Sequence, residues 1–292
     1  MKIINILFIL FSFSISAQVL DNQKGNAFTD APFFNEDFIR KNRIKQLSGY
    51  YVLKKKGELM KTTKYKYVYQ FDKEGHFVSS YETMPLDGTK DTIWSVYEYN
   101  NDQLMVFKKT DQEGFTSVYY KRDEKGRVIE EAHKREVYDT KDVIIQTLNF
   151  NTERFEYYDF DRQTKRTKFN SYDLPYLDEF FNYNELGYLV ERIERQKMTS
   201  DTYTFSYEYN EKGLLSAIRK SSNREDGFLE EFTFKYDELD NLIEKHVYKK
   251  GVFITDIQII YNSKTKLISS IFTRQVSTGY LTIIRFNDFE YF

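Results

Sequence analysis

Aromatic and polar residues alternate along several stretches of this chain. From Tyr65 to Phe71 every second residue is aromatic, and the same period of two returns in the ranges 203–209, 232–236 and 280–286. Successive side chains of a β-strand point to opposite faces of a sheet. The alternation therefore predicts half-buried strands that have one aromatic face and one polar face. Within 203–209 we expect Tyr207 on the packed face of the sheet and Glu208 on the solvent-exposed face.

These strands run into a recurring phrase: an aromatic residue, Asp or Asn, two variable residues, and often Gly before an aliphatic residue. Clear copies occupy Phe181–Leu189, Tyr207–Leu215 and Phe234–Leu242. The final aromatic residue of successive copies is Tyr183, Tyr209, Tyr236, Tyr261 and Phe286, at intervals of 26, 27, 25 and 25 residues. Asp and Asn side chains hydrogen-bond to the backbone two residues on, and Gly accepts positive φ, so the phrase predicts a tight turn. One β-hairpin with its connection uses roughly 25 residues, which accounts for the period.

Weaker copies of the phrase precede the clear ones, near Phe71, Tyr99 and Tyr120. Between Val128 and Leu177 it survives only as Phe150-Asn151 and Phe160-Asp161, so the count of copies is eight or nine. No Pro-, Gly- or Ser-rich linker separates the copies. The chain is therefore predicted to be all-β, with one antiparallel β-hairpin repeat array over residues 49–292 that forms a single curved or coiled sheet.

The N-terminal residues have the pattern of a secretory signal peptide. Lys2 is followed by an apolar stretch from Ile3 to Phe13, and the small residue Ala17 precedes Gln18. Such a segment is too short for a comfortable membrane span. We predict cleavage after Ala17, with residues 1–17 removed, no membrane span in the mature chain, and export to the periplasm, cell surface or medium.

Residues 18–48 are predicted to form a leader and a short helical cap. Asn35 is a suitable N-cap for a helix from Glu36 to Lys45, with Phe38, Ile39 and Ile44 on its inner face. Repeat arrays need a cover over their terminal edge. This helix is expected to provide it, with the first hairpin starting near Gly49.

Composition narrows the possible functions. Aromatic residues make up 18% of the chain and charged residues 30%, a mixture that suits a sheet with one apolar and one wet face and argues against disorder. The formal net charge of −2 predicts no general attraction to nucleic acid. The absence of cysteine excludes disulfides and a lipid-anchored cysteine at the cleavage point, so stability must come from burial and strand pairing.

The recurring Tyr or Phe, Asp or Asn, Gly and aliphatic residues resemble the YD-repeat family, also called Rhs repeats, over roughly Tyr65 to Phe292. In the large members of that family many such hairpins spiral into a β-shell that encloses a toxin domain. This chain has fewer copies and no cargo domain after the last one. The resemblance implies a hairpin array with an exported, envelope or extracellular role.

No catalytic motif is present, and we predict no catalytic, cofactor-binding or metal-binding residue. The histidines His76, His133 and His246 are at least 57 residues apart and are expected to be solvated. Neighbours on a strand point to opposite faces, so neither doublet of carboxylates can converge on one substrate; these are Glu130-Glu131 and Glu230-Glu231. The acidic segments Asp159–Asp161 and Asp237–Asn241 suit turns better than calcium.

We therefore predict an exported, non-enzymatic repeat scaffold that binds a protein or glycan partner through an extended sheet face. One alternative is an outer-membrane β-barrel, for which sixteen to eighteen strands, a signal peptide and the terminal Phe292 are suitable. Against it, Asp288 and Glu290 share a strand face with Phe292, where a lipid-facing band should be free of charge. The other alternative is a polysaccharide hydrolase.

Overall fold

The computed structural model describes residues 18–86, 89–110, 114–139 and 143–292, so the predicted signal peptide lies outside the described residues. Within these ranges one short helix, α1 (Glu36–Lys41), precedes eighteen strands. These are β1 (Ile44–Lys54), β2 (Lys61–Phe71), β3 (Phe77–Leu86), β4 (Thr89–Asn100), β5 (Gln103–Thr110), β6 (Gly114–Arg122), β7 (Val128–Tyr138), β8 (Ile144–Asp159), β9 (Gln163–Phe169), β10 (Pro175–Tyr183), β11 (Leu189–Gln196), β12 (Thr202–Tyr209), β13 (Leu215–Ser222), β14 (Phe228–Tyr236), β15 (Leu242–Lys249), β16 (Val252–Tyr261), β17 (Ile268–Gln275) and β18 (Tyr280–Tyr291).

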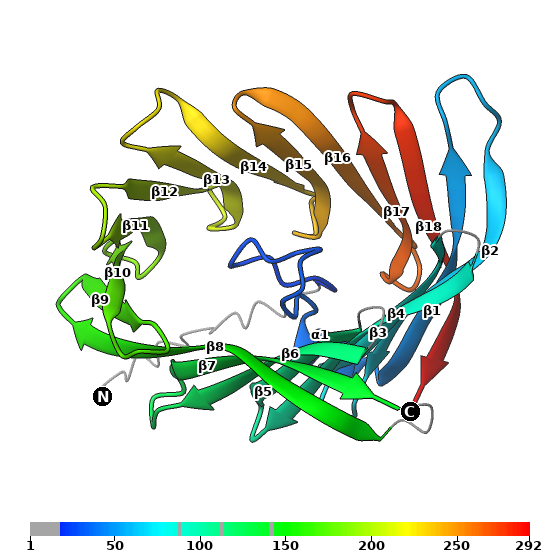
Figure 1. The fold of residues 1–292 in the computed structure, drawn as a ribbon. Coiled ribbons are helices and arrows are strands. Elements are labelled where there is room, and N and C mark those ends of the chain that lie inside the picture. The colour runs from blue at the N-terminus through cyan, green and yellow to red at the C-terminus, as the bar shows by residue number, and fades with distance from the viewer. Residues whose placement is uncertain (1–17, 87–88, 111–113, 140–142) are drawn as a thin grey trace, which may run out of the picture.

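The eighteen strands form one antiparallel sheet that closes on itself (Figure 1). Each strand pairs with its neighbours in sequence, and β1 pairs with both β2 and β18. The predicted all-β antiparallel hairpin sheet is confirmed, but its shape is a closed barrel rather than an open array. The β1–β18 ladder, from Ile44↔Tyr291 to Lys54↔Leu281, makes the difference, because closure removes both free ends of the sheet.

The recurring phrase forms the turns at one rim of the barrel. In each clear copy the Asp or Asn side chain accepts from the backbone N–H groups two and four residues on, as Asn210 does from Lys212 and Leu214, both at 3.0 Å. Asn184 and Asp237 make the same pair of bonds. Gly213 has φ of +77°, which a residue with a Cβ rarely adopts. The turn chemistry predicted from the sequence is therefore confirmed.

The aromatic face of the sheet lines the inside of the barrel. Tyr207 packs against the core, whereas the neighbouring Glu208 is 55% exposed and pairs with Arg219 on the outer wall. The predicted register is confirmed. Because facing residues of paired strands point the same way, each inward row continues around the wall from strand to strand.

Residues 18–35, which we call the plug, lie inside the barrel (Figure 1). Two aromatic residues of the plug, Phe33 and Phe34, are buried against Tyr69, Phe71 and Phe77 of the inner wall, with ring centroids 4.8–6.0 Å apart. Val19, Leu20 and Ala27 are also buried. The main hydrophobic core is thus the contact between the plug and one side of the wall.

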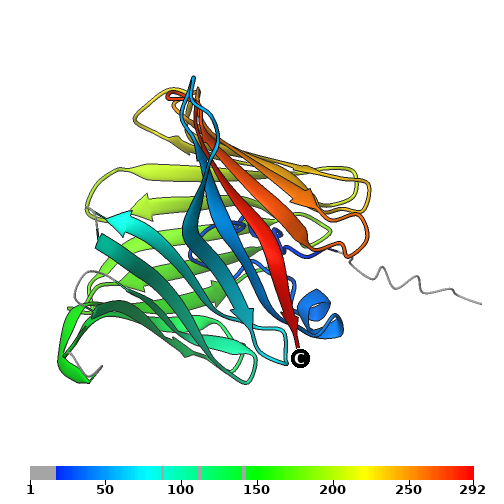
Figure 2. The ribbon, with the colours of Figure 1, turned by 90° about the vertical axis from the view of Figure 1, so that its right-hand side faces the viewer.

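The helix after the plug is shorter than predicted. Asn35 caps it by accepting from the backbone N–H of Phe38 at 3.1 Å, and Phe38 and Ile39 are buried as expected. The helix ends at Lys41, because Arg43 has a positive φ of 53° and Ile44 already begins β1, ahead of the predicted hairpin start at Gly49. Its predicted role as an edge cover is wrong, since β1 and β18 pair and leave no terminal edge. Figure 2 shows the helix at the rim beside the start of β1.

The segment in which the phrase fades differs from the rest of the wall. β8 spans sixteen residues, but β9 pairs only with Arg154 to Asp159. The first part of β8, from Ile144, has β7 on one side and no strand on the other among the described residues. No residue of β6 to β11 belongs to the core that contacts the plug.

Candidate functional site

The plug is fastened to the inner wall by polar contacts from three directions. Lys245 of β15 donates to the backbone carbonyl of Ala27 at 2.7 Å, and Tyr97 of β4 donates to the carbonyl of Asp30 at 2.9 Å. On β14, the hydroxyl of Tyr236 accepts from the plug residue Asn22 at 3.0 Å. Burial lowers the pKa of Lys245 to about 8.

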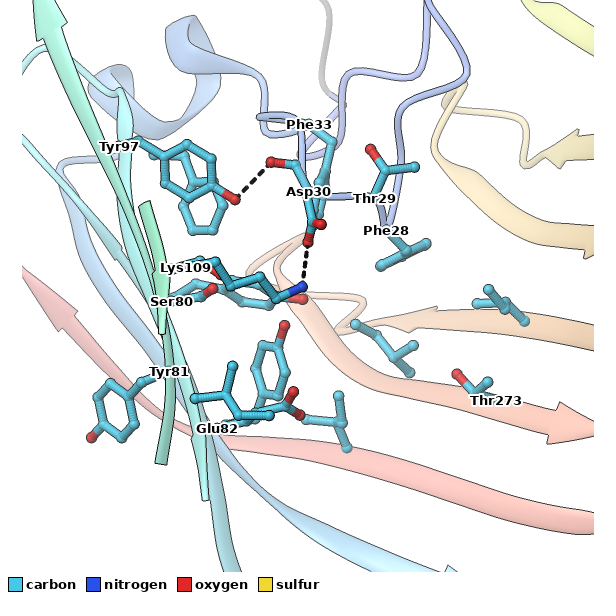
Figure 3. A pocket seen from close by; sticks show the side chains of 18 residues that line it. Phe28, Thr29, Asp30, Phe33, Ser80, Tyr81, Glu82, Tyr97, Lys109 and Thr273 are labelled. Atoms are coloured by element: carbon cyan, nitrogen blue, oxygen red, sulfur yellow. Dashed lines mark hydrogen bonds and ion pairs between the residues drawn. The ribbon is translucent and has the colours of Figure 1, made fainter. Parts of the chain in front are cut away.

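A cavity of about 550 Å³ lies beside the plug, between it and β2–β5 and β16–β18 (Figure 3). One part of its wall is apolar and aromatic, formed by Phe28, Phe33, Tyr67, Tyr69, Phe77, Tyr97, Ile257, Ile271 and Ile284. We call this space the upper cavity. Figure 3 shows the ring of Tyr81 pointing away from it, and this ring packs on Trp94 outside the barrel.

Polar groups also line the upper cavity, and Ser80 and Glu82 lie beside Tyr69 and Tyr67 on the same wall. Lys109 and Asp30 form an ion pair at 2.8 Å (Figure 3). The hydroxyl of Tyr51 donates to the carboxylate of Glu82 at 2.5 Å, and Ser80, Ser95, Thr29 and Thr273 add hydroxyl groups to the lining. Burial, reinforced by Glu82, raises the pKa of Tyr51, so this phenol stays a neutral donor.

A second cavity, of about 680 Å³, lies on another side of the plug; we call it the lower cavity. Its wall carries five tyrosines and Arg192, and the plug contributes amide and ammonium side chains; the tyrosines are Tyr183, Tyr188, Tyr207, Tyr209 and Tyr236. Tyr209 and Tyr236 donate to the carbonyls of Leu189 and Leu215, each at 2.8 Å. Tyr188 packs on Tyr209 with centroids 4.8 Å apart, and a Cβ at Gly213 would lie 2.4 Å from the Tyr188 hydroxyl.

Both cavities thus combine ring faces with hydrogen-bonding groups. Volumes of this size suit small-molecule sites, which are mostly apolar with a few placed polar groups. A ligand with an apolar face and several hydroxyl or amide groups fits both parts of each lining.

The inner face of β9–β11 is charged. On β9 and β10, Arg166 contacts the buried carboxylate of Glu179 at 2.5 Å, and Lys168 lies 3.8 Å from the same group. The guanidinium of Arg192 lies 3.1 Å from Glu194 and 4.0 Å above the centroid of Phe205. These cations are held by carboxylates and by aromatic faces together.

The prediction that all three histidines are solvated is wrong for His76. This side chain is 5% exposed, its Nδ1 lies 2.8 Å from Asp72 and its Nε2 lies 3.2 Å from Asp102. The ring also stacks on Tyr99 at 4.5 Å. Burial lowers its pKa, but the hydrogen bond and charge of Asp72 outweigh burial and leave the pKa raised. The Asp-x-x-x-His spacing within the turn was the available signal.

The other two histidines lie on opposite faces of the wall. His133 is half-buried, and its pairing with Val118 places it on the inside. His246 contacts Asp256 and Glu244 on the outside, at 3.4 and 3.5 Å. The three do not meet, and each contacts carboxylates of its own strand or of a neighbouring strand or turn.

The carboxylates singled out in the sequence also remain apart. Glu130 pairs with Lys121 outside, while burial raises the pKa of the inward Glu131. Glu231 pairs with Arg219 outside, and Glu230 faces Lys220 inside. The prediction that neither doublet converges is confirmed.

The acidic turn segments have structural partners. Asp159 contacts Arg127 at 3.0 Å and Lys125 at 3.1 Å, and Asp237 caps its own turn. Within the described ranges, no group of three or more His, Asp or Glu side chains is arranged to hold a metal ion. Sequence reasoning missed the polar lining of the upper cavity, because Asp30, Glu82 and Lys109 belong to three distant segments.

The outer wall is polar and laced with ion pairs. Arg219 lies between Glu208 and Glu231, and Asp256 contacts Arg274 at 2.8 Å. Further pairs join Lys235 to Glu244 at 2.7 Å and Lys45 to Glu290 at 2.8 Å. In the part of the chain that the structure describes, no helix has the length and hydropathy needed to cross a bilayer.

No protein-family model and no curated protein matches this chain. Among solved structures it is similar to a porin-like protein from Bacteroides uniformis, at 9% identity and TM-score 0.40 over 85% of this chain and 98% of that one. A porin-like protein from Bacteroides vulgatus matches at 11% identity and TM-score 0.35, over 84% and 97% of the two chains. A structure of TcdB2-TccC3-TEV matches at 13% identity and TM-score 0.31, over 77% of this chain and 15% of that one. Identities and TM-scores this low say nothing about what the present chain binds.

Proposed function

We propose that this protein is an exported, non-enzymatic binding barrel that holds a small glycan inside its lumen. The observation that carries the proposal is the upper cavity, whose lining combines aromatic rings with Glu82, the Asp30–Lys109 pair and four hydroxyl side chains. A sugar ring presents an apolar C–H face to aromatic rings and hydroxyl groups to carboxylates and hydroxyls. The proposal moves the binding site for the predicted glycan partner from the outer face of the sheet to the lumen.

The closed wall and the plug favour binding inside. The plug is hydrogen-bonded to the wall at Asn22, Ala27 and Asp30, so the side of each cavity that it forms is fixed in place. A preformed cavity lowers the entropic cost of binding. On the outer face, by contrast, many charged side chains form ion pairs with one another.

Binding is tested by screening the mature protein, residues 18–292, against an array of defined neutral and acidic oligosaccharides and titrating the best one by calorimetry. Thr273→Phe fills the upper cavity and is expected to weaken binding at least tenfold. The matched control is Thr233→Phe on the outer face of β14, which should bind as the wild type does. Failure of every oligosaccharide to bind, or equal binding by Thr273→Phe, would contradict the proposal.

The outer-membrane barrel is the second candidate, favoured by closure of an even number of antiparallel strands. Its lipid-facing band would have to accommodate outward groups such as Arg219, Glu231 and Asp256, and charges there are costly. The two candidates differ in solubility. Mature protein that stays folded and soluble without detergent supports the water-exposed barrel, whereas folding only in detergent or lipid supports the membrane barrel.

A further inference from the structure

The first half of β8 is an open sheet edge in a barrel that is otherwise closed. β7 covers one side of it, but the pairing with β9 begins only at Arg154. The hydroxyl of Ser171 meets the backbone of Thr152, accepting from its N–H at 2.9 Å. From Ile144 to Asn151 no strand covers the far side among the described residues, so a row of backbone groups there is free to pair with another strand.

The same segment exposes an unusual amount of apolar surface. Val143, Ile144, Ile145, Leu148 and Phe150 are 55, 47, 64, 40 and 60% exposed. The neighbouring β9–β10 loop adds Tyr172 and Leu174, which are 85 and 60% exposed, and Asp173 ties this loop to Arg154 of β8 at 2.7 Å. Contiguous exposed apolar residues mark interaction surfaces, unlike single scattered ones.

Natural sheet edges are usually protected by charges. Here Val143 to Thr152 contains no charged residue. The free backbone groups require an extended strand as occupant, and the exposed side chains require one that is apolar and uncharged. The β8 segment itself meets both requirements.

The centre of the β8 segment can pair with a second copy of itself. Its pairing with β7 skips Ile145 at one end and Phe150 at the other, and leaves a regular stretch from Gln146 to Asn149. Side chains that face each other across an antiparallel pair lie on the same face of the sheet, so the two-fold axis has to run through a residue that faces its own copy. An axis through Thr147 would place Gln146 opposite Leu148 and Ile144 opposite Phe150, and the second of these is a favourable pair of an aliphatic with an aromatic side chain.

We propose that the first half of β8 pairs antiparallel with β8 of a second copy of this chain, forming a two-fold dimer through this edge. Such an interface uses the same patch on both subunits. It is separate from the lumen, so it does not depend on the ligand proposed for the cavities.

The test is the oligomeric state of the mature protein by sedimentation equilibrium over a range of concentrations. The wild type is expected to dimerise, and Leu148→Lys should raise the dimer dissociation constant at least tenfold, because two ammonium groups meet near the axis. The control is Thr204→Lys, which adds the same charge to β12, a strand that is paired on both sides, and should leave dimerisation unchanged. A monomeric wild type, or a dimer that Leu148→Lys does not weaken, would overturn the proposal.

Cross-linking gives a second measurement that does not depend on the stability of a charged variant. The chain has no cysteine, so Thr147→Cys introduces a single thiol beside the proposed axis. Mild oxidation should yield a disulfide-linked dimer with Thr147→Cys but not with Thr204→Cys. Equal cross-linking of the two variants would show random collision and count against the pairing.

Discussion

Two parts of the inner wall are lined differently: one packs against the plug in a hydrophobic core, and the other carries ion pairs. On the plugged side, β1–β5 and β12–β18, inward residues such as Tyr69, Phe77 and Leu242 are buried in one hydrophobic core with the plug. On the charged side, β6–β11, no residue joins that core, and inward residues such as Arg166 and Glu179 form ion pairs. The ladders are continuous through both sides. The hairpin frame therefore tolerates either lining, because its backbone hydrogen bonds do not depend on the side chains that face inward.

The largest effect should follow from removing an aromatic anchor of the plug. Phe34→Ala empties the space between Tyr69 and Phe71 and should lower the free energy of unfolding by about 3–5 kcal/mol. On the charged side, Phe181→Ala loses a partly buried ring under Arg166 and should lower it by only about 1–2 kcal/mol. Chemical denaturation of the two variants measures both values. Equal losses would mean that the plugged side is not the dominant core.

A smaller loss is expected when a carboxylate of the charged side is removed. Glu179→Ala leaves Arg166 and Lys168 without their shared partner and should lower the free energy of unfolding by about 2–3 kcal/mol. Glu208→Ala, which removes an exposed carboxylate from the outer wall, should change it by no more than about 0.5 kcal/mol. Urea unfolding of both variants provides the comparison. A negligible loss for Glu179→Ala would indicate that the charged side is hydrated rather than structured by its ion pairs.

The smallest effect is a difference in pH dependence at the plug. The pKa of Lys245 is lowered to about 8 in the folded protein, below its usual 10.5, so between these values the unfolded chain binds more protons. This group therefore makes the wild type more stable as the pH rises from about 8 to 10.5. Lys245→Met lacks the group and should show a flatter profile over that range, measured by urea unfolding at several pH values. Parallel profiles would mean that Lys245 is not buried against Ala27.

Much of the barrel wall could be predicted from the sequence, because its determinants are local. The alternation around Tyr207 and Glu208 fixes which side chain is packed, and Asn210 with Gly213 fixes the turn. The fading of the phrase between Val128 and Leu177 also falls where the wall becomes charged and β8 loses its second neighbour.

Closure, the plug and the cavities depend on contacts between residues far apart in the chain. Pairing of Ile44 with Tyr291 joins the two ends of the sheet, and no local pattern distinguishes this from an open array. Lys109 meets Asp30, and His76 meets Asp102, only once the plug and the rim are in place. The sequence by itself determined the hairpin, its register and its turns, since a period-two pattern and turn residues act over a few positions. Only the tertiary structure decided which inner surface became the core and which remained open as a site, because that depends on where residues 18–35 lie inside the closed barrel.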